Sequence, residues 1–157
     1  MHVISATGHR PDRLGGYRHW QAEPLIVLAA DTLVAMRPDY VWTGGAQGWD
    51  QCVGWACVRL GIPFGVIVPG MARPHGGNWP PAARAEYERL LALAADVEQR
   101  PFAGAFQEYR DRDEQLVERA DWMLALWSGV PSGTGITVRM AHERHVPVWN
   151  VWKESGL

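Results

Sequence analysis

Residues 122–135 read WMLALWSGVPSGTG, and this stretch decides the predicted fold. Its first six residues are apolar at every position, which is typical of a parallel strand that helices cover on both faces. The cluster of glycine, serine and threonine that follows leads into a helical pattern over residues 134–145. The sequence therefore predicts a strand, a tight turn and a helix, which is the repeating unit of α/β proteins.

The same unit recurs along the rest of the chain. Further strands are expected at residues 2–7, 40–43, 64–68, 96–99 and 147–152. Further helices are expected from residue 23 to the proline at 38, over 53–60, around 87–94 and over 106–120. Strands that alternate with helices predict a three-layer α/β sandwich with a mostly parallel sheet. The length of 157 residues suits one domain over residues 1–157.

Composition and charge exclude several classes of function. The chain has 15 basic and 17 acidic residues, a formal charge of −2, and these are interleaved, so a duplex nucleic acid is not an expected partner. The longest aliphatic stretch, residues 25–30, is too short to span a membrane, and no secretion signal opens the sequence. Cys52 and Cys57 are spaced for neither a disulfide nor a metal pair, and we expect two buried thiols in a cytoplasmic protein.

Four predicted strands end in glycine, at Gly8, Gly44, Gly70 and Gly129. In a parallel sheet these ends share one edge, where open α/β folds bind ligands, so we expect backbone to approach a ligand closely there. Ser132 or Thr134 lies at a predicted helix start, where free N–H groups favour an anion. An ordinary N-cap is the alternative. The usual dinucleotide and P-loop fingerprints are absent.

Several blocks of the sequence carry a resemblance to a known family. They are TGHRPDRLGGY at residues 7–17, TGGAQGWDQ at 43–51, WPPAARAEYERLL at 79–91 and RDEQLVERADWMLALWSG at 112–129. Together with SGT at 132–134, these blocks resemble the YpsA/YspA-like branch of the SLOG superfamily. That branch is related to the lysine-decarboxylase-like phosphoribohydrolases and to DprA. The chain departs from the family pattern at Asp113, where asparagine is usual, and at Ser132, where glycine is usual.

The resemblance implies a Rossmann-like fold that binds a nucleotide or a nucleotide-derived ligand. With the glycine turns, it gives the candidate ligand-binding residues Gly8, His9, Arg10, Gly44, Gly45, Gly48, Asp50, Arg112, Ser132, Gly133, Thr134 and Gly135. No catalytic residue is assigned, and no cofactor or metal is expected. His142 and His145 have a metal-ligand spacing, but they also suit the end of a helix, where cationic side chains are favoured.

Some residues allow two interpretations. Asp50 could contact the ligand or simply stabilise a helix N-terminus. Asp113 interrupts an apolar helix face, so its carboxylate is either part of a site or paired with Arg110 or Arg112. Among nine tryptophans, those at 42, 122, 127, 149 and 152 fall on predicted strands and are expected in the core. Trp49 and Trp79 lie in predicted loops and could stack on a base, or else line a dimer surface.

Three functions compete. The first is a sensor or carrier of an ADP-ribose-like molecule or a nucleoside phosphate, in a homo-oligomer that is most simply a dimer. The alternative is an N-glycosidic-bond hydrolase or transferase acting on nucleoside monophosphates, as the phosphoribohydrolase resemblance implies. Thr137 stands where those enzymes carry a glutamate, and Glu86, Asp50 or Asp113 would have to replace it. The third is a DprA-like single-strand binder, which the acidic balance disfavours.

Overall fold

The computed structural model describes residues 1–157, and a six-stranded sheet forms its centre. Every pair of neighbouring strands runs parallel, so the sheet is entirely rather than mostly parallel. The strand order is β4-β3-β2-β1-β5-β6. The strands are β1 (Val3–Gly8), β2 (Tyr40–Thr43), β3 (Phe64–Val68), β4 (Asp96–Gln99), β5 (Trp122–Leu126) and β6 (Val148–Asn150).

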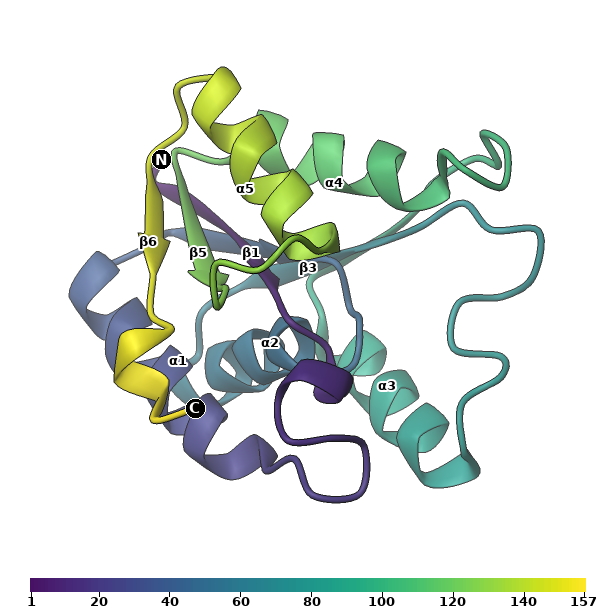
Figure 1. The fold of residues 1–157 in the computed structure, drawn as a ribbon, viewed down its shortest axis with the longest axis horizontal. Helices are drawn as coiled ribbons and strands as arrows, with labels where there is room; N and C mark the ends of the chain where they lie inside the picture. The colour runs from purple at the N-terminus through teal and green to yellow at the C-terminus, as the bar shows by residue number, and fades with distance from the viewer.

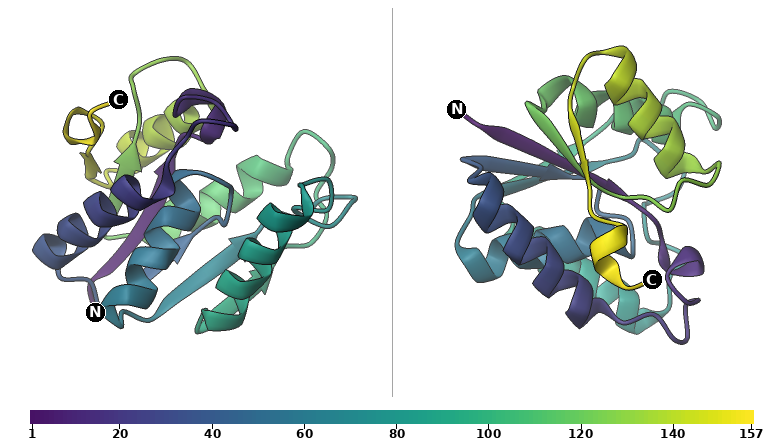
Figure 2. Two further views of the ribbon diagram at one scale, coloured as in Figure 1. Left: turned by 90° about the horizontal axis from the view of Figure 1, so that it is seen from below. Right: turned by 60° about the vertical axis from the view of Figure 1, so that its left-hand side comes forward.

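Five α-helices cover the sheet in two layers, which confirms the three-layer Rossmann-like sandwich (Figure 1). One face carries α1, α2 and α3, and the other carries α4 and α5 (Figure 2). The helices are α1 (Ala22–Met36), α2 (Trp49–Leu60), α3 (Pro81–Leu93), α4 (Glu108–Arg119) and α5 (Gly133–Glu143). Short 3₁₀ turns, η1 (Pro11–Arg13) and η2 (Lys153–Ser155), complete the fold. None of the helices is long and apolar enough to cross a lipid bilayer.

Two of the predicted helix ends depend on local residue chemistry. Pro24 lies in the first turn of α1, where its missing N–H removes no helical hydrogen bond. Gly61 ends α2 in the left-handed conformation, at a φ of 69°, which a side chain with a Cβ rarely adopts. Its N–H donates back to the carbonyls of Cys57 and Val58.

The hydrophobic core is unequal on the two faces of the sheet. The main cluster holds 21 buried residues, largely from α1, α2 and the strands. The second cluster, under α4 and α5, holds only Val117, Met123, Met140 and Ala141. Cys52 and Cys57 are unpaired and buried within the main cluster, as expected. The hydrophobic cluster on the α4–α5 face is therefore much smaller than the one on the other face.

The strand tryptophans were expected in the core, and this expectation is wrong for two of them. Trp122 and Trp149 are 39% and 40% exposed and pack edge to face, 6.5 Å apart. Trp122 is the first residue of β5, and Trp149 lies on β6, which has no strand beyond it. The other three, at 42, 127 and 152, are half-buried, and only Trp152 packs against the main cluster. Trp127 and Trp152 lie just beyond the ends of β5 and β6 rather than on these strands.

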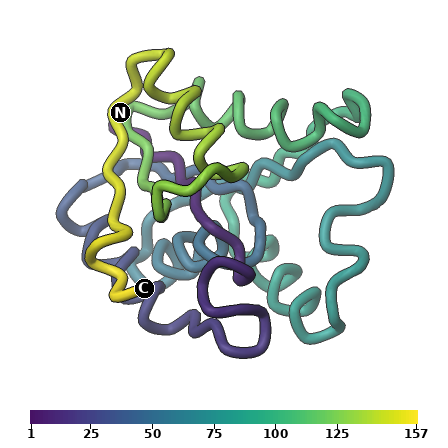
Figure 3. The backbone as a smooth tube through the Cα atoms, in the orientation of Figure 1, coloured from purple at the N-terminus to yellow at the C-terminus, as the bar shows by residue number.

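The direction in which the chain adds strands to the sheet reverses between β1 and β5, which makes this position a topological switch point. From β1 the chain adds β2, β3 and β4 on one side and then returns to β5 on the other. The loops that leave β1 and β5 therefore start side by side (Figure 3), and the His9 N–H donates to the Leu126 carbonyl at 3.1 Å. Ligands of open α/β proteins bind at this position, outside the carboxyl ends of the strands.

Candidate anion-binding site at the switch point

A cavity of about 340 Å³ lies at the switch point, between the β1 loop, the start of α2, and helices α4 and α5. We call it the edge cavity. Only three of its sixteen lining residues are hydrophobic, so it suits a polar or charged ligand. The lining residues are Thr7, Gly8, His9, Arg10, Asp12, Arg13, Ala46, Asp50, Tyr109, Arg112, Asp113, Leu116, Ser132, Gly133, Thr134 and Thr137.

The N-terminus of α5 is capped and still has free donors. Ser132 is the N-cap, and its side-chain oxygen accepts from the N–H of Gly135 at 3.1 Å. The N–H of Ile136 donates to the Ser132 carbonyl, which leaves the N–H groups of Gly133 and Thr134 without a partner in the chain. The turn is thus both an ordinary cap and a potential anion site, because two N–H groups and the helix dipole face a cavity.

Arg112 brings a positive charge to the floor of the cavity. Arg112 is only 5% exposed. Its Nε donates to Asp113 Oδ1 at 2.6 Å, and one of its terminal nitrogens donates to the Gly44 carbonyl at 2.8 Å. Burial alone would lower the pKa of Arg112, but the carboxylates of Asp113 and Asp50 outweigh it and raise that pKa. The guanidinium therefore stays charged, and its second terminal nitrogen forms no hydrogen bond within the protein.

Asp113 was expected either to belong to a site or to be paired with an arginine, and it does both: it is paired with Arg112 and it lines the cavity. One oxygen binds Arg112, and the other accepts from the Thr137 hydroxyl at 3.1 Å. The resemblance described above places Thr137 at the position of the phosphoribohydrolase glutamate. The Asp113 carboxylate from α4 lies beside Thr137, whereas Glu86 lines a different cavity.

Asp50 is the least satisfied charged group of the cavity. It is 5% exposed in the first turn of α2, and its Oδ1 is buried without any hydrogen-bond partner. Burial raises the pKa of this carboxyl to about 6, against the opposing charge of Arg112 and with a further contribution from Asp113. A buried carboxyl with a raised pKa and one unpaired oxygen is more typical of a functional site than of a helix cap.

His9 lines the cavity as a neutral ring. Its Nε2 accepts from the Ser128 N–H at 3.1 Å, so the ring proton lies on Nδ1. Burial and the charge of Arg13 lower the pKa of His9. The imidazole links the loops after β1 and β5 and packs edge-on against Trp152. It can donate from Nδ1, but it brings no charge to a phosphate.

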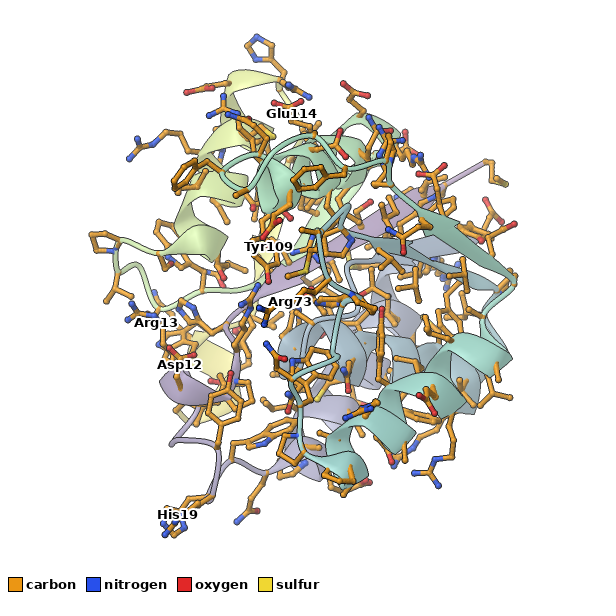
Figure 4. The ribbon with its side chains drawn as sticks, turned by 90° about the vertical axis from the view of Figure 1, so that its right-hand side faces the viewer. Asp12, Arg13, His19, Arg73, Tyr109 and Glu114 are labelled. Carbon is orange, nitrogen blue, oxygen red and sulfur yellow. The ribbon has the colours of Figure 1, made fainter.

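Two unpaired arginines lie at the rim. Arg10 and Arg13 are exposed and form no salt bridge within the protein. The Arg10 guanidinium lies 4.8 Å from the centre of the Tyr109 ring, and that of Arg112 lies 5.6 Å from it. In Figure 4, Asp12 and Arg13 lie next to each other, Tyr109 lies above them, and Glu114 and His19 lie toward the top and the bottom of the view. Arg13 and Tyr109 were not among the expected site residues, although they lie close in sequence to Arg10 and Arg112.

Four glycines among the candidate residues do not line the cavity. An added Cβ at Gly44 would clash with Arg112 and Asp50, and one at Gly45 would clash with Tyr87 and Val66. An added Cβ at Gly48 would clash with the His9 carbonyl, and one at Gly135 would contact the Trp127 ring. At these positions the backbone approaches another part of the protein. The expected close approach to a ligand is therefore not what explains these glycines. Gly133 differs, because an added Cβ there would meet nothing within 4 Å.

Stacking of a base on Trp49 is excluded by burial. Trp49 has no exposed surface, belongs to the main core cluster, and donates from Nε1 to the Leu124 carbonyl at 3.3 Å. Trp79 remains accessible, but it lines a hollow next to the edge cavity rather than the cavity itself. Tyr109 lines both and forms the wall between them.

Gly8→Ala is expected to lower the free energy of unfolding by about 1–3 kcal/mol, the usual cost of overpacking. An added Cβ at Gly8 would lie 2.5 Å from the Cβ of the buried Trp49, far inside van der Waals contact. Urea denaturation measures the effect. Gly133→Ala is the matched control, with open space around its Cβ, and equal stability of the two variants would contradict this packing role.

No protein-family model matches the sequence, and no curated protein sequence matches it significantly. Solved structures are similar in fold. TM1055, a structural genomics target, matches with a TM-score of 0.63 at 18% identity, over 94% of this chain and 72% of the other. A molybdenum cofactor carrier protein from Chlamydomonas reinhardtii matches with a TM-score of 0.59 at 18% identity, over 95% and 75%.

The DNA processing protein DprA is also similar in fold. The protein from Streptococcus pneumoniae matches with a TM-score of 0.65 at 13% identity, over 95% of this chain. That from Helicobacter pylori, described as binding single-stranded DNA, matches with a TM-score of 0.64 at 14% identity, also over 95%. This chain spans only 50% and 64% of those two proteins. At such identities the likenesses establish a shared fold and nothing more.

Proposed function

We propose that the edge cavity binds the phosphate of a nucleotide or nucleotide-derived ligand, and that the chain is a sensor or carrier of that ligand. One observation carries the proposal: two unpaired N–H groups of α5 and the buried guanidinium of Arg112 line the same cavity. Backbone donors at a helix N-terminus together with a fixed arginine are the usual means of phosphate recognition. Arg10 and Arg13 at the rim add positive charge and form no salt bridge within the protein, and Asp12 lies beside them in the same lining.

Asp50 suggests that the ligand also carries hydroxyl groups. A carboxyl group beside a phosphate would repel it unless the carboxyl is protonated or accepts a hydrogen bond from the ligand. A ribose hydroxyl supplies such a donor. A nucleoside phosphate or an ADP-ribose-like molecule provides the phosphate and the sugar together.

The base would extend beyond the edge cavity, because about 340 Å³ is near the lower limit for a small-molecule site. The adjacent hollow has about 350 Å³ and is lined by residues 71–79 with Ala105, Glu108 and Tyr109. Its far wall includes Trp79, which packs edge-on against His75 and Tyr87 at 5.1 and 5.2 Å. We infer that the base binds there, between Tyr109 and Trp79.

Trp79→Leu is expected to weaken binding of AMP or ADP-ribose by roughly five- to a hundredfold, because stacking on an aromatic side chain contributes roughly 1–3 kcal/mol per base. Isothermal titration calorimetry measures the change. Trp122→Leu, which removes an exposed tryptophan on β5 outside the cavity, is the control. Unchanged affinity of Trp79→Leu would place the base elsewhere.

Membership of the SLOG superfamily, in its YpsA-like branch, is part of the same proposal. The sequence blocks described above support it, and so does a fold shared with DprA and a molybdenum cofactor carrier. A carrier on this fold agrees with the proposed role. Single-strand DNA binding, the role described for the Helicobacter protein, is less favoured because the formal charge is −2 and no long basic groove is evident.

The proposal is tested by calorimetric titration of the wild-type protein with AMP, ADP-ribose and inorganic phosphate, after a mass-spectrometric inventory of small molecules that co-purify with it. We expect AMP or ADP-ribose to bind more tightly than inorganic phosphate, and phosphate to compete with both. Absence of binding by all three at millimolar concentration would contradict the proposal.

Cleavage of an N-glycosidic bond is a second candidate, and the two carboxyls of the edge cavity favour it. Asp50, with a pKa of about 6, can hold a proton for a leaving base, and Asp113 could stabilise positive charge on a sugar. Asp113 is however already bound to Arg112 and Thr137, so much of its charge is compensated.

We therefore expect hydrolysis of nucleoside monophosphates to be absent or slow, below the order of one turnover per second that ordinary enzymes reach. Chromatographic detection of free base after incubation with AMP measures it, with Asp113→Asn as the control for any residual activity. Multiple turnovers above that rate, lost in Asp113→Asn, would make the hydrolase the main function.

A homodimer in the cytoplasm remains a prediction. The exposed pair of Trp122 and Trp149, at the β6 edge of the sheet, is a candidate interface because large exposed aromatic side chains are enriched at protein contacts. The buried, unpaired cysteines agree with a reducing compartment. Sedimentation velocity tests the dimer.

A further inference from the structure

A second cavity of about 590 Å³ is lined by residues near the N-terminal ends of α1, α2 and α3. These three helices cover one face of the sheet (Figure 1). We call it the tryptophan cavity. In contrast to the edge cavity, nine of its fourteen lining residues are hydrophobic. They are Tyr17, Trp20, Ala22, Ile26, Gln47, Gln51, Cys52, Trp55, Asn78, Trp79, Pro80, Ala82, Ala83 and Glu86.

The segment of residues 46–51 separates the two cavities. Ala46 and Asp50 line the edge cavity, whereas Gln47 and Gln51 line the tryptophan cavity. One short segment therefore lines two cavities, of which one is mainly polar and the other mainly hydrophobic. No residue lines both of these cavities, but Asn78 and Trp79 line both the tryptophan cavity and the hollow proposed for the base.

Aromatic rings form the walls of the tryptophan cavity. Tyr17, Trp20, Trp55 and Trp79 come from four different places in the chain, and Trp20 and Trp55 pack against the main core. The aromatic contacts of Trp79 are with His75 and Tyr87, not with the other two tryptophans. Rigid aromatic side chains that enclose a space favour a flat, apolar ring as ligand.

Two polar groups at this cavity lack a partner in the protein. Gln51 is 6% exposed, and its Nε2 donates to the Gly45 carbonyl at 3.0 Å, which fixes the side chain while its Oε1 accepts no hydrogen bond. The indole Nε1 of Trp55 is buried and donates to nothing. Of these two groups only the Trp55 N–H is buried without a partner, and such groups are rare, since each costs about 1–3 kcal/mol. The cavity thus offers one acceptor and one donor.

The tryptophan cavity has no cationic side chain that could bind a phosphate. No lysine or arginine lines it, and its single charged residue, Glu86, is paired with Arg89 on the surface of α3. An anion would lose hydration there and gain no partner. An uncharged ring that carries its own donor and acceptor fits each of these features.

We propose that the tryptophan cavity is a second binding site, distinct from the edge cavity and bordering the hollow proposed for the base at Trp79, for an uncharged planar heteroaromatic ring of nucleobase or nicotinamide size. The ring lies among the tryptophans, donates to Gln51 and accepts from Trp55. A second copy of this chain is a poorer occupant, because the cavity is concave and the unpaired Trp55 N–H is buried.

The test uses adenine and nicotinamide as probes, titrated into the full chain and followed by NMR. Wild type is expected to bind at least one probe, and Ala83→Trp, which fills the cavity, is expected to weaken binding at least tenfold. Ala85→Trp, on the same helix but outside the cavity, and Gly133→Glu, in the edge cavity, are expected to bind as wild type does. Trp55→Phe keeps the ring but removes the donor, and is expected to weaken binding several-fold, as loss of one hydrogen bond does.

Three results would overturn the proposal. The first is no binding of either probe to wild type at millimolar concentration. The second is binding that both Ala83→Trp and Trp55→Phe leave unchanged, or that Gly133→Glu abolishes. The third is a wild-type dimer in sedimentation velocity that Ala83→Trp dissociates, which would assign the cavity to a second copy of the chain.

Discussion

Gly133→Glu is expected to lower the affinity for AMP or ADP-ribose at least a hundredfold while the protein stays as stable as wild type. Gly133 is the first residue of α5, and an added Cβ there meets no heavy atom within 4 Å, so the new side chain has room to enter the edge cavity. Its carboxylate would occupy the place proposed for the phosphate, and juxtaposed like charges cost several kcal/mol. An acidic residue at a helix N-terminus also favours folding.

Gly133→Gln is the matched control, because it has the same shape without the charge. We expect it to bind much more tightly than Gly133→Glu in calorimetry, with both variants unfolding at wild-type urea concentrations or higher. If glutamate and glutamine weaken binding equally, the effect is steric and the anion site is elsewhere.

Asp50→Asn is expected to raise the free energy of unfolding by about 3 kcal/mol above pH 7 and by only about 0.5 kcal/mol at pH 4. The folded pKa of about 6 lies above the usual value of 3.8, so the folded chain holds the proton more tightly than the unfolded chain does. Well below pH 3.8 both states are largely protonated. Between pH 4 and 6 the unfolded state is deprotonated while the folded state keeps its proton, and the stability of wild type falls by about 1.4 kcal/mol for each pH unit.

Urea denaturation of wild type and Asp50→Asn at pH values from 4 to 8 measures this difference. Asp31→Asn, on the exposed side of α1, is the control and should stay within about 0.5 kcal/mol of wild type. A stabilisation that does not grow with pH, or a loss of stability at neutral pH, would show that Asp50 is a structural carboxylate.

Most of the fold was predictable because its signals are local. The apolar run of β5, the glycine at the end of α2 and the prolines around α1 each determine their own element through side-chain volume or backbone conformation. The positions of the tryptophans were not predictable in the same way. Whether Trp122 or Trp49 is covered depends on which helices cross over it, and neither spacing nor strand propensity contains that information.

The candidate site was predictable in part. Position at a strand end identified residues that do line the edge cavity, among them His9, Asp50 and Thr134. Glycine was a poorer guide, because Gly44 and Gly48 allow close contacts between loops rather than contact with the cavity. The pairing of Asp113 with both Arg112 and Thr137 joins α4 to α5, and only the packing of the two helices brings it about.

The most direct test of the central claim is a titration of ¹⁵N-labelled protein with AMP, followed through the backbone amide resonances. The free N–H groups of Gly133 and Thr134 should show the largest downfield shifts, because a phosphate oxygen would accept their hydrogen bonds. Inorganic phosphate should shift the same two resonances in the same direction at higher concentration. If both ligands bind while these two amides move no more than those of α1, phosphate does not bind at the N-terminus of α5 and the proposed site is wrong.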